Sequence, residues 1–496
     1  MVMPFPKVTI VVVPRERLSF IQRSLSTIFA QTSLPFDLIY VSGGLPLSVQ
    51  RNLEAEASRK NFKFIHSENY LSPNHARNLA LPHVRTPYVV FLDNDALVTK
   101  GWLEALLKCA EETGATIVGP LYLIGEFDRA IVHMAGGRLH LKEEAGNRIL
   151  VDEQYLFDTP LSEATMRLSR SRCDYMEFHC MLIRMDLFER IGLMDEKLPS
   201  LHEERDICLN AVKAGGSVFI EPKAIVTYVP PPPFEWWDMP YFMMRWSDLW
   251  TRESVRHFNA KWSLKEVRHI SDTKNAYEEG SVVGFAKAWR RRMAGMNILS
   301  GTSEVSVDSP IDQAKLMIAL LQSFDREYFD LALSGDGGHF VEIGRSLPPK
   351  TLHQELPLFM ARAEAEGLNL LIRPIRSSPD APTFLRLDDC SEIDLKRWGP
   401  HACLTLRTRI DRYQCWLAVN ANDARSKAQL PEHSSNPAGT TEAAGFVPLA
   451  GASFTSSHDH AATQFPVRII QGIAGRLTLA HQLESAAPFP NSCMVQ

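Results

Sequence analysis

The sequence predicts an α/β protein with two domains, the first built on a mainly parallel sheet and the second an α+β domain with a mostly antiparallel sheet. A chain of 496 residues exceeds what one hydrophobic core usually serves. In residues 1–264, strands alternate with helical segments, as in parallel βαβ units. Residues 311–496 instead contain strand pairs separated by short turns. We expect a helical, polar linker at residues 265–310 and a poorly ordered C-terminal tail.

The composition is that of an ordinary soluble globular protein, with 45% hydrophobic and 22% charged residues. The formal net charge of -5 gives no global attraction to nucleic acid or to anionic membranes. The eight cysteines contain no Cys-x-x-Cys pair, which favours reduced thiols in a cytoplasmic protein over disulfides or a zinc ribbon. No apolar stretch reaches the length of a membrane span, so any membrane contact is expected to be peripheral.

The first elements of the chain predict a parallel βαβ unit. Residues 8–13 are continuously β-branched and indicate a buried strand that Pro14 ends. Residues 18–30 carry apolar side chains at helical spacing, and residues 36–41 indicate the next strand. Such an opening requires a right-handed crossover and therefore a parallel sheet.

A helix that carries an arginine and an asparagine follows a further predicted strand at residues 62–65. Ser72 and Pro73 form a favourable helix start, which places Arg77 and Asn78 on this helix. The guanidinium of Arg77 is suited to neutralising a phosphate group, and a surface ion pair is the alternative interpretation.

Two carboxylates then end an apolar strand at residues 88–92. Asp93 and Asp95 stand at its carboxyl end, where open α/β sheets place their ligands. Acids at i and i+2 project to the same side of a continuing strand, or hold one ion if the chain turns. This pattern suits a hard divalent cation that binds a diphosphate. The alternative is a turn whose acids only cap the next element.

The order of these segments resembles that of a family 2 glycosyltransferase with the GT-A nucleotide-sugar-binding fold, over residues 8–264. The matching pieces are the β-branched first strand, the βαβ crossover, the Ala-Arg-Asn helix at residues 76–78 and the Phe-Leu-Asp-Asn-Asp segment at residues 91–95. Residues 174–184 resemble the acceptor-side strand of that family, and residues 187–196 resemble its helix and following turn.

The segment at residues 202–209 resembles the part of the family that supplies the base in inverting members. There an acid deprotonates the acceptor hydroxyl. Glu203 and Glu204 are adjacent, so only one can point inward from a helix, and the choice between them stays open. A solvated helix start with acids placed against the helix dipole is the alternative interpretation.

The resemblance implies metal-assisted transfer of a sugar, with inversion, from a nucleoside-diphosphate donor to a hydroxyl of a glycan, lipid or protein acceptor. The expected metal is Mn²⁺ or Mg²⁺. The resemblance assigns catalysis to Glu203 and Glu204, donor binding to Arg77, Asn78, Asp93 and Asp206, and metal binding to Asp93 and Asp95. Two positions depart from the family: Ser42 stands where an Asp commonly contacts the nucleoside, and Tyr228 stands where a His often occurs.

The second half predicts a helix at residues 311–329 and two strand pairs. Residues 369–374 and 383–389 are interpreted as one pair joined by a polar loop. Residues 402–407 and 413–419 are interpreted as a hairpin.

This order resembles the RepB-like DNA primase domain of plasmids and phages, in the archaeo-eukaryotic primase group, over residues 311–483. The resemblance implies that Asp388 and Asp389 hold a divalent metal. Residues 408–410 and 448–456 depart from the family, and residues 448–456 lack its basic and amide groups. The alternative function is therefore a nucleic-acid-binding or primase-type protein that contacts DNA through its second half. Primase activity would require both acids to face an open groove with a third acid nearby.

Overall fold

The computed structural model describes residues 5–125, 130–230, 234–271, 309–335, 340–377, 381–419, 445–454 and 465–473, together with residues 289, 298, 299, 307 and 379. Most of the predicted linker and all of the predicted tail beyond residue 473 lie outside these residues. The chain forms two units. The first consists of Met1–Pro231 and Arg245–Trp289, and the second of Pro232–Met244 and Arg290–Gln496.

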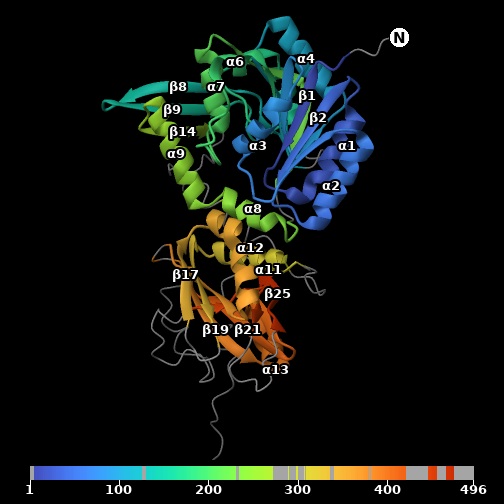
Figure 1. The fold of residues 1–496 in the computed structure, drawn as a ribbon. Helices are drawn as coiled ribbons and strands as arrows, with labels where there is room; N and C mark the ends of the chain where they lie inside the picture. The colour runs from blue at the N-terminus through green and yellow to red at the C-terminus, as the bar shows by residue number, and fades with distance from the viewer. Residues whose placement is uncertain are drawn as a thin grey trace, which may run out of the picture. The chain divides into compact units, whose positions relative to one another are not determined.

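The first unit is built on an 11-stranded sheet (Figure 1). Its main path runs in the order β10 (Thr159–Pro160), β7 (Ile131–Met134), β6 (Ile117–Ile124), β12 (Cys180–Arg184), β4 (Tyr88–Asp93), β1 (Val8–Val13), β2 (Phe36–Gly43) and β3 (Lys63–Ser67). Off this path, β13 (Val218–Tyr228) pairs with β6, β11 (Ser171–Cys173) and β5 (Ala96–Val98).

The parallel part of this sheet follows from the βαβ pattern of the sequence. Strand β1 is parallel to both β2 and β4, and β2 is parallel to β3. All of β1 is buried, as its continuous β-branched sequence predicts. Strand β12 runs antiparallel between β4 and β6. The helices of this unit are α1 (Ile21–Gln31), α2 (Leu47–Lys60), α3 (Pro73–Ala80), α4 (Trp102–Thr113), α5 (Leu161–Ala164), α6 (Asp186–Ile191), α7 (Glu203–Lys213) and α9 (Asp248–Trp262).

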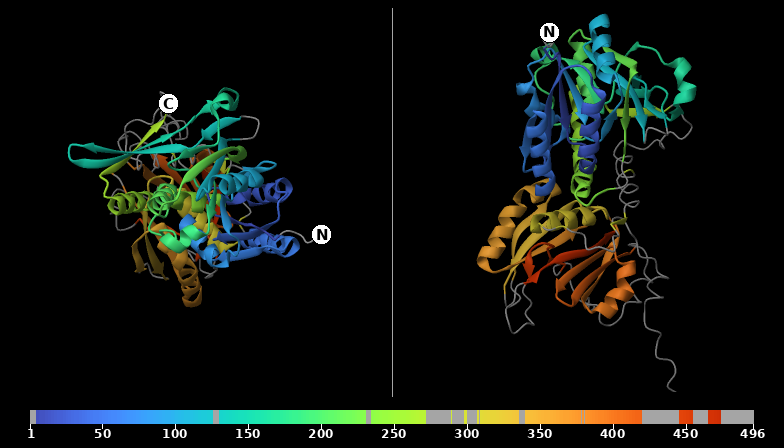
Figure 2. Two further views of the ribbon diagram at one scale, coloured as in Figure 1. Left: turned by 90° about the horizontal axis from the view of Figure 1, so that it is seen from above. Right: turned by 90° about the vertical axis from the view of Figure 1, so that its right-hand side faces the viewer.

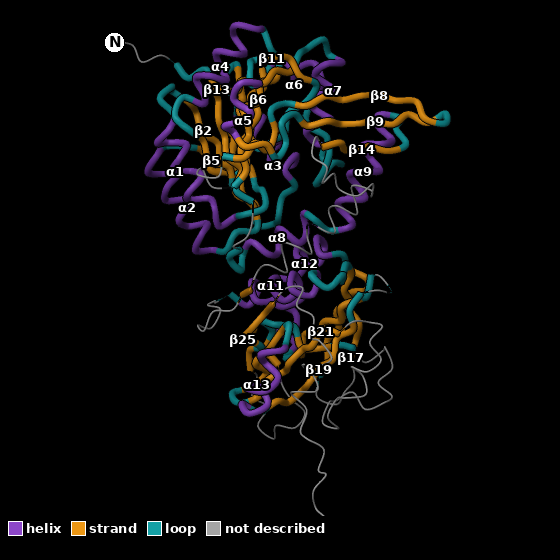
Figure 3. The backbone as a smooth tube through the Cα atoms, turned by 180° about the vertical axis from the view of Figure 1, so that it is seen from behind, coloured by secondary structure: helices purple, strands orange, loops and turns teal. Residues whose placement is uncertain are grey.

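A second, 3-stranded sheet belongs to the first unit and consists of β14 (Glu266–Ser271), β9 (Asn147–Gln154) and β8 (Gly137–Glu144). Helix α9 packs on it, because Phe258 of the helix shares a buried apolar cluster with Leu150 and Val267 of the sheet (Figure 3). Strands β8 and β9 form a long antiparallel hairpin whose turn lies at Ala145 and Gly146.

The sheets of the second unit are antiparallel wherever their pairing is described (Figure 2). A 5-stranded sheet has the order β15 (Ile298–Leu299), β25 (Arg468–Ile473), β20 (Leu404–Arg409), β21 (Arg412–Val419) and β19 (Thr383–Cys390). A 4-stranded sheet has the order β17 (Phe340–Leu347), β16 (Tyr328–Ser334), β18 (Asn369–Ile375) and β22 (Val447–Pro448). Strands β23 (Ser453–Phe454) and β24 (Phe465–Pro466) form a short pair. Its helices are α11 (Pro310–Gln322), α12 (Pro349–Glu366) and α13 (Glu392–Trp398), and α8 (Asp238–Arg245) lies almost wholly in this unit.

The predicted α/β fold class, with a parallel-rich first sheet and mostly antiparallel later sheets, is confirmed. The predicted hairpin at residues 402–407 and 413–419 is also confirmed as β20 and β21. The predicted pairing of residues 369–374 with residues 383–389 is wrong. Strand β18 pairs with β16, and β19 pairs with β21, so the two strands lie in different sheets. Partner choice depends on distant apolar strands, which the short intervening loop does not reveal.

Two further expectations concern the state of the cysteines and the absence of a membrane-spanning segment. All seven cysteines in the described residues are buried and none forms a disulfide. Of the helices that the structure describes, none combines the length and the apolar character needed to cross a membrane.

Candidate functional site

The turn after β4 is held between the ends of two neighbouring strands. The backbone N–H of Asp93 donates to the carbonyl of His179, just before β12, at 3.1 Å. The N–H of Asn94 donates to the carbonyl of Val13, at the end of β1, at 3.0 Å. These bonds fix Asp93 and Asp95 at the carboxyl end of β4, and both residues are 0% exposed.

The segment that follows β1 wraps around this turn. The Asn94 side chain accepts from the backbone N–H of Arg15 at 2.6 Å and donates to the carbonyl of Arg17 at 3.0 Å. The Asp95 carboxylate accepts from the backbone N–H of Glu16 at 3.1 Å. The ends of β1 and β4 therefore form one local structure rather than two separate loops.

Three cationic or protonatable side chains from different elements surround Asp93. Arg15 Nε lies 3.3 Å from Asp93 Oδ2, and His179 Nδ1 lies 3.0 Å from the same oxygen. Arg77 Nη2 lies 3.7 Å from Asp93 Oδ1. Burial alone would raise the pKa of Asp93, but Arg15 and His179 outweigh burial and lower it. Burial acts in the opposite direction on Arg77 and lowers its pKa to about 10.

The environment of Asp95 is different, because none of the ion pairs among the described residues involves it. Burial, together with the nearby charges of Asp93 and Glu16, raises the pKa of Asp95 to about 7. Tyr228, at the end of β13, donates its hydroxyl to Glu16 at 2.9 Å. Within the described part of the chain, the Oδ1 atoms of both Asp93 and Asp95 are buried without a hydrogen-bond partner. Two such carboxylate oxygens are the ligands that Mg²⁺ or Mn²⁺ prefers.

The two predicted donor-side residues of α3 point to different partners. The guanidinium of Arg77 lies over the ring of Phe178, 3.6 Å from its centroid, and Nη1 donates to Asn74 at 3.0 Å. Asn78 instead donates to the carbonyl of Met194 and to Glu196, at 2.9 and 2.8 Å. Arg77 thus belongs to the group around Asp93, whereas Asn78 ties α3 to the turn after α6.

Asp206 also lies apart from that group. It is in the first turn of α7, where its carboxylate accepts from Lys261 at 2.8 Å, from Trp262 at 2.9 Å and from Asn210 at 3.1 Å. None of these three partners contacts Asp93 or Asp95 in the described hydrogen bonds and ion pairs. The structure therefore uses Asp206 to join α7 to α9.

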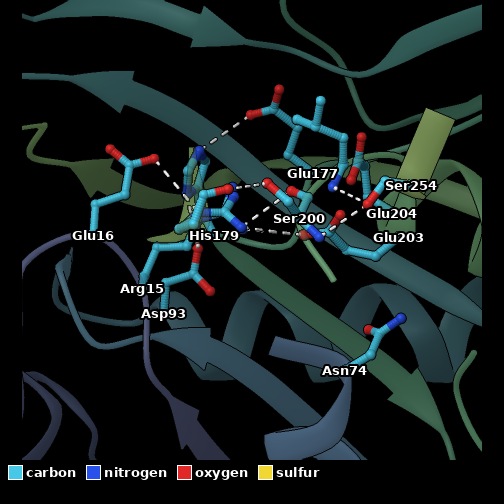
Figure 4. A network of polar contacts seen from close by, with 12 residues as sticks. Arg15, Glu16, Asn74, Asp93, Glu177, His179, Ser200, Glu203, Glu204 and Ser254 are labelled. Carbon is cyan, nitrogen blue, oxygen red and sulfur yellow. Dashed lines mark hydrogen bonds and ion pairs between the residues drawn. The ribbon is translucent and has the colours of Figure 1, made fainter. Parts of the chain in front are cut away.

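The two adjacent glutamates at the start of α7, both labelled in Figure 4, pair with different arginines. The Glu203 side chain is 1% exposed and pairs with Arg15 at 3.1 Å, so Arg15 bridges Glu203 and Asp93. The Glu204 side chain is 13% exposed and pairs with Arg205, which also pairs with Asp152. Burial is the main reason that the pKa of Glu204 is raised to about 7, with Glu203 adding to the rise and Arg205 opposing it.

The acids at the end of β19 are not brought together. Asp388 accepts from Gln414 at 2.5 Å and pairs with Arg386 at 2.9 Å. Asp389 has a φ of 55° at an irregularity in the pairing with β21, is 66% exposed at its side chain, and lies 3.9 Å from Arg412. In the part of the chain that the structure describes, no third acid joins them in a group able to hold a metal. Their predicted metal role gains no support from this geometry.

Sequence reasoning missed Arg15, Glu16 and His179. One available signal was position, because Arg15 and Glu16 follow β1, whose last residue, Val13, is in register with Asp93, the last residue of the adjacent parallel strand β4. Parallel neighbours present their carboxyl ends at the same edge of a sheet. His179 had a weaker signal, since its place beside Asp93 depends on β12 running antiparallel.

Comparison with known proteins gives a family match in the first unit. Residues 9–192 match the model of the family "Glycosyl transferase family 2". A pre-mycofactocin glycosyltransferase of Mycobacterium tuberculosis is 26% identical over 165 residues, which is 33% of this chain and 31% of that protein. The chain thus spans about a third of the length of this curated relative.

Two solved structures show more distant likenesses. A mannosyltransferase from Pyrobaculum calidifontis, solved with GDP-Man and Mn²⁺, is 16% identical with a TM-score of 0.34, covering 64% of this chain and 74% of that chain. The primase RepB' is 20% identical with a TM-score of 0.28, covering 36% of this chain and 62% of that chain. At these scores no property of either protein is transferred, and the primase resemblance stays a prediction. The resemblance of the first half to family 2 glycosyltransferases is confirmed by the match over residues 9–192, which includes Asp93 and Asp95 and ends before Glu203.

Proposed function

We propose that the first unit transfers a sugar from a nucleoside-diphosphate donor to an acceptor hydroxyl, with inversion and with a divalent metal. The observation that supports this most directly is the buried turn after β4. It presents two carboxylate oxygens without hydrogen-bond partners beside the guanidinium groups of Arg15 and Arg77. Perturbed carboxylates at the carboxyl end of a parallel strand are typical of a binding site.

Asp93 and Asp95 would hold Mn²⁺ or Mg²⁺, which supplies positive charge for the departing diphosphate. Arg15 and Arg77 add two fixed cations to the same place. Guanidinium groups form charge-assisted hydrogen bonds with phosphate oxygens, so they favour the more negative state of the leaving group. Among the described residues, Arg77 Nε and Nη2 have no hydrogen-bond partner, and Nη2 lies 3.7 Å from Asp93 Oδ1 in an ion pair, so Nε is the donor that remains for a ligand.

Glu204 is our choice for the general base. A base must reach the acceptor hydroxyl and be deprotonated near neutral pH, and Glu204 combines partial exposure with a pKa of about 7. Glu203 is nearly inaccessible and is committed to Arg15. We therefore assign Glu203 a positioning role, in which it orients Arg15 toward the diphosphate.

The proposal is tested with the full chain, Mn²⁺ and a panel of uridine, guanosine and thymidine diphosphate sugars. The first readout is the melting temperature, because a ligand that binds the folded state raises it by mass action. The second is release of nucleoside diphosphate with and without sugar acceptors. We expect at least one donor to raise the melting temperature only in the presence of metal. Undiminished turnover in Asp95→Ala would exclude the proposed metal pair.

A further inference from the structure

A group of side chains able to bind a metal lies beside the turn that carries Asp93 and Asp95, which we call the acidic turn. His133 of β7, Glu177 and His179 each offer one ligand atom, and these atoms lie within 4.8 Å of one another. His133 Nε2 is 2.8 Å and His179 Nε2 is 3.3 Å from the same oxygen, Glu177 Oε2. In the part of the chain that the structure describes, this is the one group of three or more such residues.

Two of these side chains, His179 and Glu177, have outer contacts of the kind found around a metal, whereas His133 Nδ1 is buried without a hydrogen-bond partner among the described residues. The remaining ring nitrogen of His179, Nδ1, is hydrogen-bonded to Asp93 at 3.0 Å. The remaining oxygen of Glu177, Oε1, accepts from Gln154 of β9 at 2.7 Å. Metal-ligating histidines usually bond their other nitrogen to a carboxylate, and ligating carboxylates are usually hydrogen-bonded as well. These outer hydrogen bonds therefore fix the orientation of His179 and Glu177. His179 Nε2 and Glu177 Oε2 face each other.

The surroundings hold the imidazole groups in place without closing the cluster. The ring of Tyr228 stacks on His179 with centroids 4.1 Å apart, and the ring of Tyr122 meets it edge-on at 5.9 Å. The side chains of His133, Glu177 and His179 are 15%, 20% and 6% exposed, so an ion can reach the cluster from solvent.

We propose that His133, Glu177 and His179 bind one divalent transition-metal ion of the zinc type, at a site distinct from the oxygen pair of Asp93 and Asp95. Two imidazole nitrogens and one carboxylate oxygen are a ligand set that Zn²⁺ takes when one position stays open. Mg²⁺ prefers oxygen ligands, so the two sites differ in the ions they select. Because Asp93 contacts the Nδ1 side of His179, it acts on this site as an outer partner and not as a ligand.

The test measures zinc directly and needs no sugar donor, so its result is independent of the proposed transferase activity. Untagged full-length protein is stripped with chelator, incubated with Zn²⁺, desalted and analysed by mass spectrometry for metal content. We expect about one zinc ion per chain. Titration calorimetry should show at least about tenfold weaker binding for His133→Ala and for Glu177→Gln. Circular dichroism checks that each variant is folded.

A matched control comes from another histidine and glutamate pair in the same unit. His140 lies 3.4 Å from Glu153 on the exposed hairpin, without a third ligand, so His140→Ala should keep wild-type zinc binding. In the cobalt-substituted protein, a visible absorption band should be present in His140→Ala and lost in His133→Ala. The milder variant His133→Gln provides the same readout if His133→Ala does not fold.

The variant Asp95→Ala separates the two sites. Retention of zinc by Asp95→Ala supports a distinct site. Loss of zinc in Asp95→Ala but not in Glu177→Gln assigns the ion to the acidic turn and overturns the proposal. Absence of bound zinc in the wild-type protein, or equal zinc binding by the wild-type, His133→Ala and Glu177→Gln proteins, also overturns it.

Discussion

At the end of β4 the side chains of Asp93 and Asp95 are both fully buried, whereas at the end of β19 the side chain of Asp388 is 24% exposed and that of Asp389 is 66% exposed. Both pairs lie at or near the carboxyl end of a strand, so the two sequence patterns look alike. The cations near them have different origins. Asp388 forms an ion pair with Arg386 of its own strand. Asp93 instead contacts Arg15, Arg77 and His179, which come from three distant segments.

This difference shows how much a buried acidic pair requires from the rest of the fold. Removing one partner of a buried ion pair typically costs about 3–5 kcal/mol, because an uncompensated charge remains. Solvent compensates an exposed acid such as Asp389 without any help from the fold. The group around Asp93 therefore supports the proposed site. The predictions below compare the acids of β4 with those of β19 and the start of α7 with that of α13.

The largest expected effect separates the two acidic pairs by activity. Asp95→Ala should lower metal-dependent sugar transfer by at least about 100-fold, because it removes a ligand for the charge that stabilises the leaving group. Asp389→Ala should leave transfer unchanged. Initial rates at saturating donor measure both variants. Equal losses in the two would show that the comparison between the strand ends is mistaken.

The next effect compares two helix starts. Glu204→Gln in α7 should lower kcat by about 100-fold while the KM for the donor stays within a factor of about two, because a general base acts in the chemical step. Glu203→Gln should mainly raise the donor KM, since Glu203 positions Arg15. The control is Glu392→Gln in the first turn of α13, which should change neither parameter. A larger loss of kcat in Glu203→Gln than in Glu204→Gln would exchange the two roles.

The pH dependence of kcat/KM gives a second comparison between the starts of α7 and α13. The pKa of Glu204 is raised to about 7, chiefly by burial, and the base must be deprotonated to work. We expect kcat/KM to fall about tenfold per pH unit below 7 and to level off above it. In α13, the Ser391 hydroxyl lowers the pKa of Asp394, so that acid adds no titration near neutrality. A profile for Glu204→Gln with the same fall below pH 7 would rule out Glu204 as its source.

The smallest effects concern stability of the second unit. Asp388→Asn should lower the free energy of unfolding by about 1 kcal/mol, because it weakens the contacts with Arg386 and Gln414. Asp389→Gly should raise it by about 0.5 kcal/mol, since glycine adopts a positive φ without steric cost. Urea denaturation followed by circular dichroism measures both. A melting temperature raised by Mn²⁺ in the wild-type protein, and no longer raised in Asp389→Gly, would instead support a metal role for this acid.

The sequence predicted those parts of the molecule that local pattern determines. Residues 8–13, 36–41 and 88–92 are rich in apolar side chains, with Thr9 and Asp37 as the exceptions, and they form the parallel strands β1, β2 and β4. The start of α3 at Pro73 follows from proline at the first helical position. Asp93 and Asp95 were identifiable because their strand ends abruptly in acids.

The remaining features depend on contacts between distant segments. The position of His179 beside Asp93 is fixed only by the antiparallel register of β12 with β4. The separation of β18 and β19 into two sheets depends on β16, a strand absent from the sequence prediction. The different environments of Glu203 and Glu204 arise from their ion pairs with Arg15 and Arg205. The spacing of residues along a helix does not predict which arginine each glutamate contacts.

The antiparallel strand β12 also determines where the chain tolerates a change of length. Cys180 pairs with Leu92, one residue before Asp93, so deleting a residue of β12 would turn its following side chains to the opposite face of the sheet. The turn at Ala145 and Gly146 between β8 and β9 is exposed and has no such constraint. A peptide tag or fluorescent label inserted at that turn would report on the protein while leaving the registers of β4 and β12 intact.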